Sequence, residues 1–124
     1  MVAASLLDMK KIAIAAITAG LFAASSATAG AFPLVGTNGL CPNAWNLLQY
    51  VESTYPSVQS IGGVRSDSRP DHPSGHALDI MIGSDMGLGD AINGDVQSQS
   101  GRFGVKYTMW RVAGHFNHVH VTVA

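Results

Sequence analysis

A single cysteine, Cys41, stands in this chain of 124 residues. No disulfide can form within the chain, so Cys41 stays a free thiol or pairs with another chain. We expect a buried free thiol, because its neighbours Leu40 and Pro42 are apolar. Small domains bury a modest share of their unfolded surface and usually gain stability from disulfides or a metal. With internal disulfides excluded, a bound metal ion remains open as a second source of stability beside the apolar core.

Residues 1–29 have the pattern of a secretory signal peptide. Lys10 and Lys11 precede an apolar run over residues 12–24, and Ala27-Thr28-Ala29 forms a small-residue cleavage site. The run is shorter than the roughly 18–20 residues that a membrane-spanning helix needs. We expect cleavage after Ala29 and a protein that is secreted or held in the cell envelope. Met9 directly precedes the lysines and is a second candidate start.

Opposite charges nearly balance in this chain. Lys and Arg number 7 and Asp and Glu 8, for a net charge of −1. Nucleic-acid binding relies on a cationic surface that neutralises phosphates, and the chain has no basic excess. We therefore expect no nucleic-acid partner. We also expect no membrane association after signal cleavage, and a monomer. The length is that of one domain.

The order of predicted elements defines a fold class. Residues 30–40 carry glycines and a proline without periodicity and are expected to be a linker before a single domain at 41–124. A helix is predicted to begin at Pro42 and to end before Pro56. Further predictions are strands at 58–61, 77–82, 105–110 and 118–123 and a weaker helix over 88–96. This order predicts a small α+β domain with a mainly antiparallel sheet and flanking helices.

Two of the predicted strands alternate between an apolar and a polar face. In the last strand, valines occupy every second position, which leaves His118, His120 and Thr122 on the opposite face. In the strand ALDIMI, leucine and isoleucines share one face and Asp79 lies on the other. The apolar faces are expected to build the core. We expect the aromatic residues Trp45, Tyr107 and Trp110 to pack in that core rather than bind glycans.

The five histidines of the chain fall into two clusters near its C-terminal half. In the second cluster, the imidazoles of His118 and His120 lie roughly 6.6 Å apart at the backbone and can converge on one ion. Asp79 is a candidate further ligand, because a carboxylate among apolar residues is costly without a counter-charge or a metal. His72 can reach the same point across a Pro-Ser-Gly turn. Two alternatives stay open: a solvated polar face, or ion pairs of Asp79 with Arg65 or Arg69.

Both histidine clusters resemble the metal motifs of one peptidase superfamily. The segment His72-x-x-Gly75-x-Ala77-x-Asp79 matches the H-x-x-G-x-A-x-D core of D-Ala-D-Ala carboxypeptidases. His118-x-His120 resembles the H-x-H of lysostaphin-like and murein endopeptidases. These enzymes form the LAS group, which includes the hedgehog signalling domain, and the similarity covers roughly residues 40–124. The chain also resembles secreted actinobacterial domains that carry an HPSG segment and a terminal HVHV strand.

This resemblance implies a ligand set and two catalytic groups. It assigns the Zn2+ ligands to His72, Asp79 and His120, and the proton-transfer or transition-state group to His118. Three protein ligands leave a fourth position for water, which is the catalytic arrangement of zinc. Arg65 resembles an arginine of the carboxypeptidases that stabilises the oxyanion or holds a substrate carboxylate. The alternative for Arg65 is an ion pair with Asp67 or Asp71.

The function implied is that of an exported zinc-dependent peptidase that hydrolyses a peptide bond of the peptidoglycan stem or cross-bridge. The expected fold is then the one shared by hedgehog and D-Ala-D-Ala peptidases. The alternative function is a catalytically inactive, zinc-stabilised module that binds the cell wall. A third possibility is a metal-free domain in which the histidines are structural.

The chain also departs from the superfamily pattern. Pro70 replaces the usual serine two residues before the first histidine, and Asn117 stands where some members carry a glutamate. An asparagine does not act as a base, so catalysis by a glutamate at that position is excluded. Two histidines are extra: we expect His76 at the surface and His115 at the edge of the site.

Overall fold

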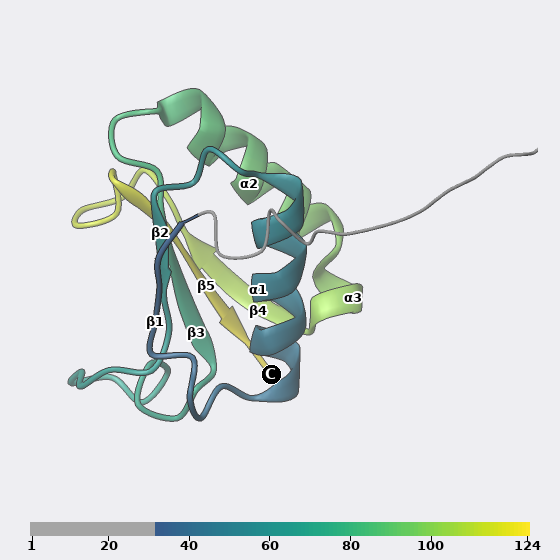
Figure 1. Cartoon of the computed structure of the whole chain (residues 1–124), viewed down its shortest axis with the longest axis vertical. Helices are drawn as coiled ribbons and strands as arrows, with labels where there is room; N and C mark the ends of the chain where they lie inside the picture. Colours follow the sequence, from purple (N-terminus) through teal and green to yellow (C-terminus); the bar gives the residue numbers. More distant parts are fainter. Residues whose placement is uncertain (1–31) are drawn as a thin grey trace, which may run out of the picture. The chain divides into compact units, whose positions relative to one another are not determined.

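The structure is a computed structural model that describes residues 32–124 (Figure 1). The signal peptide and its cleavage site lie outside the described residues. The strands are β1 (Leu34–Val35), β2 (Ser60–Gly62), β3 (Ala77–Met81), β4 (Val105–Met109) and β5 (His118–Val123). The helices are α1 (Pro42–Thr54), α2 (Met86–Ser98) and α3 (Ser100–Phe103). Among the described residues, no helix is long and apolar enough to cross a membrane.

One five-stranded sheet organises the domain, in the order β1-β2-β3-β5-β4. β1 pairs with β2 in parallel, and the other three pairings are antiparallel. The predicted α+β class with a mainly antiparallel sheet is therefore confirmed. The two strands that carry the candidate ligands, β3 and β5, lie at the centre of the sheet and are hydrogen-bonded to each other.

The apolar core lies between the sheet and helices α1 and α2, which Figure 1 shows on one side of the sheet. Helix α1 packs against β3 and β5, and α2 packs against β4 and β5. Helix α1 begins at Pro42 as predicted and ends before Pro56, because a proline disfavours helical backbone in the residue before it. The core side chains include Leu47, Leu48, Val51, Leu78, Ile80, Ile92, Val96, Val119 and Val121.

The segment that we expected to be a linker differs from the prediction in its described part. Leu34 and Val35 pair with Ile61 and Gly62 as strand β1, and Phe32 is buried in the core. A two-residue strand is too short to show the alternation from which strands are predicted. The domain therefore begins before residue 41, and Cys41 is a half-buried free thiol at the start of α1.

Strand β4 contains an irregularity that moves one aromatic side chain away from its expected place. Val105 is opposite Val123 and Tyr107 is opposite Thr122, so the register shifts between them, as at a β-bulge. Val105 keeps to the core face, whereas Tyr107 joins the face of Thr122 and is 38% exposed. Our prediction that Tyr107 packs in the core was wrong. Trp45 is also exposed, and Trp110 is partly buried against the core, as expected.

Candidate metal centre

The pairing of β3 with β5 brings two candidate ligands together. Asp79 lies directly opposite His120 in the antiparallel register, and residues opposite each other point to the same face. This face is turned away from helices α1 and α2, because alternate residues of both strands form the core. The central pair of strands thus holds Asp79 and His120 side by side on a rigid support.

The third candidate ligand, His72, comes from the loop between β2 and β3. This loop turns back at Gly75, whose φ of +81° favours glycine, and a Cβ there would lie 2.1 Å from the carbonyl oxygen of Gly39. The close approach of Gly75 is therefore to the backbone near Gly39. His72 is 1% exposed, and its Nδ1 lies 2.8 Å from the carbonyl oxygen of Gly63. A carbonyl oxygen only accepts, so Nδ1 carries the proton and Nε2 points at Asp79.

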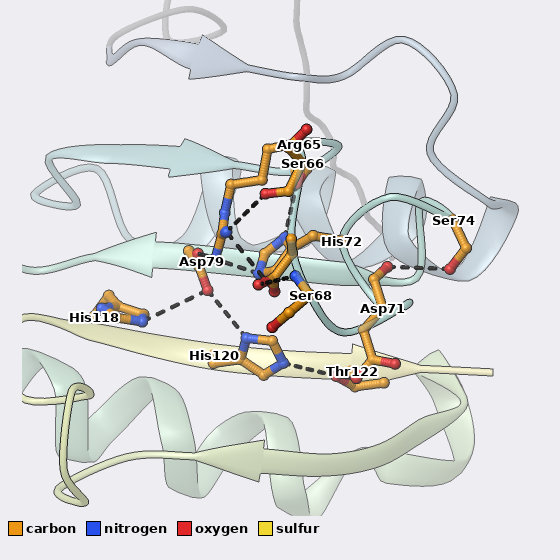
Figure 2. Close-up of polar contacts among 12 residues, drawn as sticks. Arg65, Ser66, Ser68, Asp71, His72, Ser74, Asp79, His118, His120 and Thr122 are labelled. Atoms are coloured by element: carbon orange, nitrogen blue, oxygen red, sulfur yellow. Dashed lines mark hydrogen bonds and ion pairs between the residues drawn. The ribbon is translucent and has the colours of Figure 1, made fainter.

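His72, Asp79 and His120 form a group positioned to bind one metal ion (Figure 2). One nitrogen from each histidine and one oxygen of Asp79 lie within 4.8 Å of one another. His72 Nε2 is 3.2 Å from Asp79 Oδ2, and His120 Nδ1 is 3.1 Å from Asp79 Oδ1. His72 Nε2 is also one of two buried polar side-chain atoms in the described residues that have no hydrogen-bond partner. An unprotonated nitrogen that faces a carboxylate is repelled by it unless a cation lies between them, so the residues fit a metal ion.

Asp79 is an ionised group in a buried place. Burial alone raises the pKa of a carboxyl, but the close contact with His120, the proximity of His72 and the guanidinium of Arg65 together hold the pKa of Asp79 well below its usual range. Arg65 contributes an Nη2 atom 3.1 Å from Asp79 Oδ2. The site therefore presents a carboxylate at neutral pH.

His118 lies beside the three candidate ligands (Figure 2). Its Nε2 is 3.6 Å from Asp79 Oδ1, and its Nδ1 is 2.8 Å from Oδ1 of Asn117. Burial lowers the pKa of His118, partly offset by the charge of Asp79. The proximity of His115, whose ring centroid lies 4.9 Å away, lowers the pKa further. The expected catalytic histidine is thus next to the candidate metal position and close to a second imidazole.

Arg65 is shared between two carboxylates. It lies 3.1 Å from Asp79 and 3.8 Å from Asp67, so two of the ion pairs that we kept open as alternatives are present, one with each carboxylate. Its side chain is 51% exposed, which leaves room for the guanidinium to move towards a bound molecule. Arg69 lines the same pocket.

An open pocket of about 410 Å³ lies over the group. The ten lining residues include the candidate ligands His72 and His120 together with Arg65, His115 and His118. His115 is thus at the edge of the site, as expected, and its Nδ1 lies 2.9 Å from the carbonyl oxygen of Ala113. His76 is outside this pocket, half-buried, with Nδ1 3.0 Å from Ser74 Oγ.

Three further residues lie at the site, and their place there was not predicted from the sequence. Thr122 Oγ1 lies 2.7 Å from His120 Nε2 and donates to Asp71 Oδ2 over 2.9 Å. The hydroxyl of Tyr107 donates to the same oxygen of Asp71 and thereby lowers the pKa of that carboxyl. Thr122 is recognisable in the sequence as the next residue on the face of His120. The places of Asp71 and Tyr107 depend on the loop and on the β4 register, which the sequence does not reveal.

The fold and the site together define a small α+β domain with a buried His-Asp-His group positioned for a metal ion. Residues 36–116 match the family described as VldE, C-terminal domain, and the chain belongs to this family. The matched segment contains His72 and Asp79 and ends before His118 and His120. Neither the curated proteins nor the solved structures gave a match to the chain.

Proposed function

We propose that this chain is an exported, zinc-dependent peptidase that hydrolyses a peptide bond of the peptidoglycan stem or cross-bridge. The observation that carries the proposal is the His72, Asp79 and His120 group beside His118 in an open pocket. The spacing of the same residues resembles the motifs of the LAS peptidases, which motivates the choice of substrate and the expected hedgehog and D-Ala-D-Ala peptidase fold. The N-terminal pattern of residues 1–29 motivates the proposed export to the cell envelope.

The donor set favours zinc among the metal ions. Two imidazole nitrogens and one carboxylate oxygen are ligands that catalytic zinc sites use, and a three-residue set leaves a position for water or substrate. The described residues offer no cysteine near the group, because the thiol of Cys41 lies at the start of α1. When bound, zinc supplies Lewis acidity that activates a water molecule and polarises a carbonyl group.

The residues around the ligands supply proton transfer and charge stabilisation. His118 donates from Nδ1 to Oδ1 of Asn117, which leaves Nε2 to accept a proton on the side of Asp79. Arg65 stands at the pocket with an exposed guanidinium, which can hold a substrate carboxylate or a developing oxyanion. His118 and Arg65 are the proposed catalytic residues.

Hydrolysis of muropeptides tests the proposal. The full chain, purified without chelator and loaded with zinc, is incubated with peptidoglycan fragments, and released peptides or amino acids are identified by mass spectrometry. We expect His118→Ala to lower the rate by about 10²–10⁴-fold, the usual contribution of a general acid or base, while its zinc content stays that of the wild type. His76→Ala is the matched control, since this half-buried histidine lies outside the pocket.

Equal rates for the wild type and His118→Ala would contradict the proposed catalytic role. No release of peptide from any fragment by the zinc-loaded wild type would favour the alternative, a zinc-stabilised module that binds the cell wall without turnover. That alternative has one observation in its favour. Arg65 is already held by Asp67 and Asp79, which is the arrangement of a structural arginine. Co-sedimentation of zinc-loaded protein with intact peptidoglycan, without release of peptide, would support it.

A further inference from the structure

A row of hydrogen-bonded side chains runs from Tyr107 through Asp71 and Thr122 to His120 and lies behind the proposed metal position. Asp71 and Tyr107 come from the loop before β3 and from β4, whereas Thr122 lies on β5 beside His120. Figure 2 shows Asp71 and Thr122 on the side of His120 that faces away from Asp79. These groups therefore act on His120 from outside the ligand set.

The directions of the hydrogen bonds in this row follow from which atoms can donate and which can only accept. A carboxylate only accepts, so Thr122 donates its single hydroxyl proton to Asp71 Oδ2 over 2.9 Å. Thr122 Oγ1 then has only lone pairs left for His120 Nε2, which lies 2.7 Å away. His120 must accordingly donate from Nε2. The contact leaves Nδ1 of a neutral ring without a proton, and Nδ1 is the atom 3.1 Å from Asp79 Oδ1.

The surroundings of Thr122 favour the hydrogen bond from His120 Nε2 over a hydrogen bond to water. Thr122 is 1% exposed, so no bulk water competes for the His120 proton. Asp71 is fixed by a second donor, the hydroxyl of Tyr107, whose ring also lies parallel to that of His120 with centroids 6.0 Å apart. Asp71 directly precedes His72 in the sequence, so the same carboxylate ties the loop that carries His72 to strand β5.

We propose that Asp71 and Thr122 are positioning residues that hold His120 in the Nε2-protonated tautomer and thereby present Nδ1 as the metal ligand. This inference rests on the proposed metal-binding function. Ligating histidines commonly donate their second ring nitrogen to a neighbouring acceptor, which fixes the ring and strengthens the ligand. Here the acceptor is the hydroxyl oxygen of Thr122, and the carboxylate of Asp71 polarises that hydroxyl group.

Substitution of Thr122 separates positioning from packing. Thr122→Val keeps the shape and removes the acceptor for His120, whereas Thr122→Ser keeps the hydroxyl and loses a methyl group. Thr108→Val is the matched control, because Thr108 lies on the neighbouring strand and its hydroxyl bonds Gln97 instead of a histidine. Zinc affinity is measured for the full chain by competition with a chromophoric chelator. The His120 tautomer is measured in the metal-free chain from the ring nitrogen shifts.

We expect Thr122→Val to weaken zinc binding by about 10–100-fold and to lose the Nε2-protonated form of His120, with Thr122→Ser and Thr108→Val within about threefold of the wild type. A purely structural role would lower the melting temperature of the metal-free chain and leave zinc affinity and tautomer unchanged. That result would overturn the inference, as would a wild-type His120 that carries a proton on Nδ1 at neutral pH. If Thr122→Val does not fold, the wild-type tautomer and the Thr122→Ser affinity decide.

The two proposals fail in different ways. If the wild type binds no zinc, the proposed function fails, and the tautomer of His120 in the metal-free chain still decides the role of Thr122. If the wild type binds zinc and Thr122→Val binds it equally well, the positioning role fails while the metal site stands.

Discussion

Asp79 shows how one residue in a strand decides what its surroundings must contain. Its carboxylate lies among apolar neighbours on β3, where an isolated charge is costly. The guanidinium of Arg65 compensates part of this charge, and imidazole nitrogens of His72 and His120 face the two carboxylate oxygens, as in a site for a metal ion. The anomaly of an acid in an apolar strand was therefore a sound basis for predicting a site.

Asp90 is a contrasting carboxylate on the surface, and it predicts an acid-dependent effect. Hydrogen bonds from Arg111 and Trp110 lower its pKa to about 2. A folded pKa below the unfolded value stabilises the fold above the unfolded value, near 4, and the contribution fades as the pH falls towards about 2. We expect Asp90→Asn to be less stable than the wild type at neutral pH, with a difference that shrinks between about pH 4 and pH 2.

Thermal unfolding of both proteins over a pH series measures this effect. The contact joins α2 to the residues that follow β4, so the loss is expected in the global transition. A difference in melting temperature that stays constant down to pH 2 would contradict the role of the Asp90 charge.

At the scale of elements, helix α2 contains two glycines with opposite surroundings. Gly89 is buried against Trp110, and a Cβ there would lie 2.2 Å from the indole ring, which Asp90 holds by a hydrogen bond. Gly94 is exposed, and a Cβ there would meet nothing within 4 Å. The glycines lowered the strength of the helix prediction for 88–96, yet α2 forms, because Leu88, Ile92 and Val96 pack on the sheet.

We expect alanine at these two positions to shift stability in opposite directions. Gly94→Ala should stabilise by roughly 0.5–1 kcal/mol, because alanine has the better helix propensity and a less disordered unfolded state. Gly89→Ala should destabilise by about 1–3 kcal/mol, since the indole has to move. Denaturant unfolding measures both values. A shift of the same sign in both variants would show that the indole is not held where the structure places it.

In strand β4, the alternation of residues in the sequence does not predict which side chains face the core. The prediction of a strand over 105–110 was confirmed for Val105–Met109, but strict alternation put Tyr107 on the core face with Val105. The bulge at Lys106 inverts the alternation, so that Tyr107 and Met109 face the site. A single extra residue in a strand leaves no mark on composition or spacing that distinguishes it from regular pairing.

At the scale of the whole molecule, a continuous apolar core supports the site independently of any ion. The core joins α1 and α2 to the sheet, and the candidate ligands lie on the other face of β3 and β5. A site that the fold forms in advance binds its ligand in the native state alone and stabilises it by mass action. We expect about one zinc ion per chain and, at a free zinc concentration near 100 times the dissociation constant, about 2.7 kcal/mol of added stability.

Metal analysis and thermal unfolding with and without chelator test this expectation. His120→Ala should lose the zinc and the added stability, because His120 is one of the three proposed ligands. His76→Ala should retain both, since His76 lies outside the group. A wild type without metal, whose melting temperature does not respond to zinc or chelator, would contradict the metal site.

Local periodicity predicts the fold class, the helix that begins at Pro42 and the strands β3 and β5. The resemblance of two short motifs to those of the LAS peptidases, together with the chemistry of the residues, indicates His72, Asp79 and His120 as the candidate ligands. Only the tertiary structure reveals that β1 joins the sheet, that β4 bulges, and that Asp71 and Tyr107 lie behind His120. These features depend on which segments far apart in the chain pair and in which register. Pairing is set by the free energy of the whole packed domain, and no short window of sequence contains it.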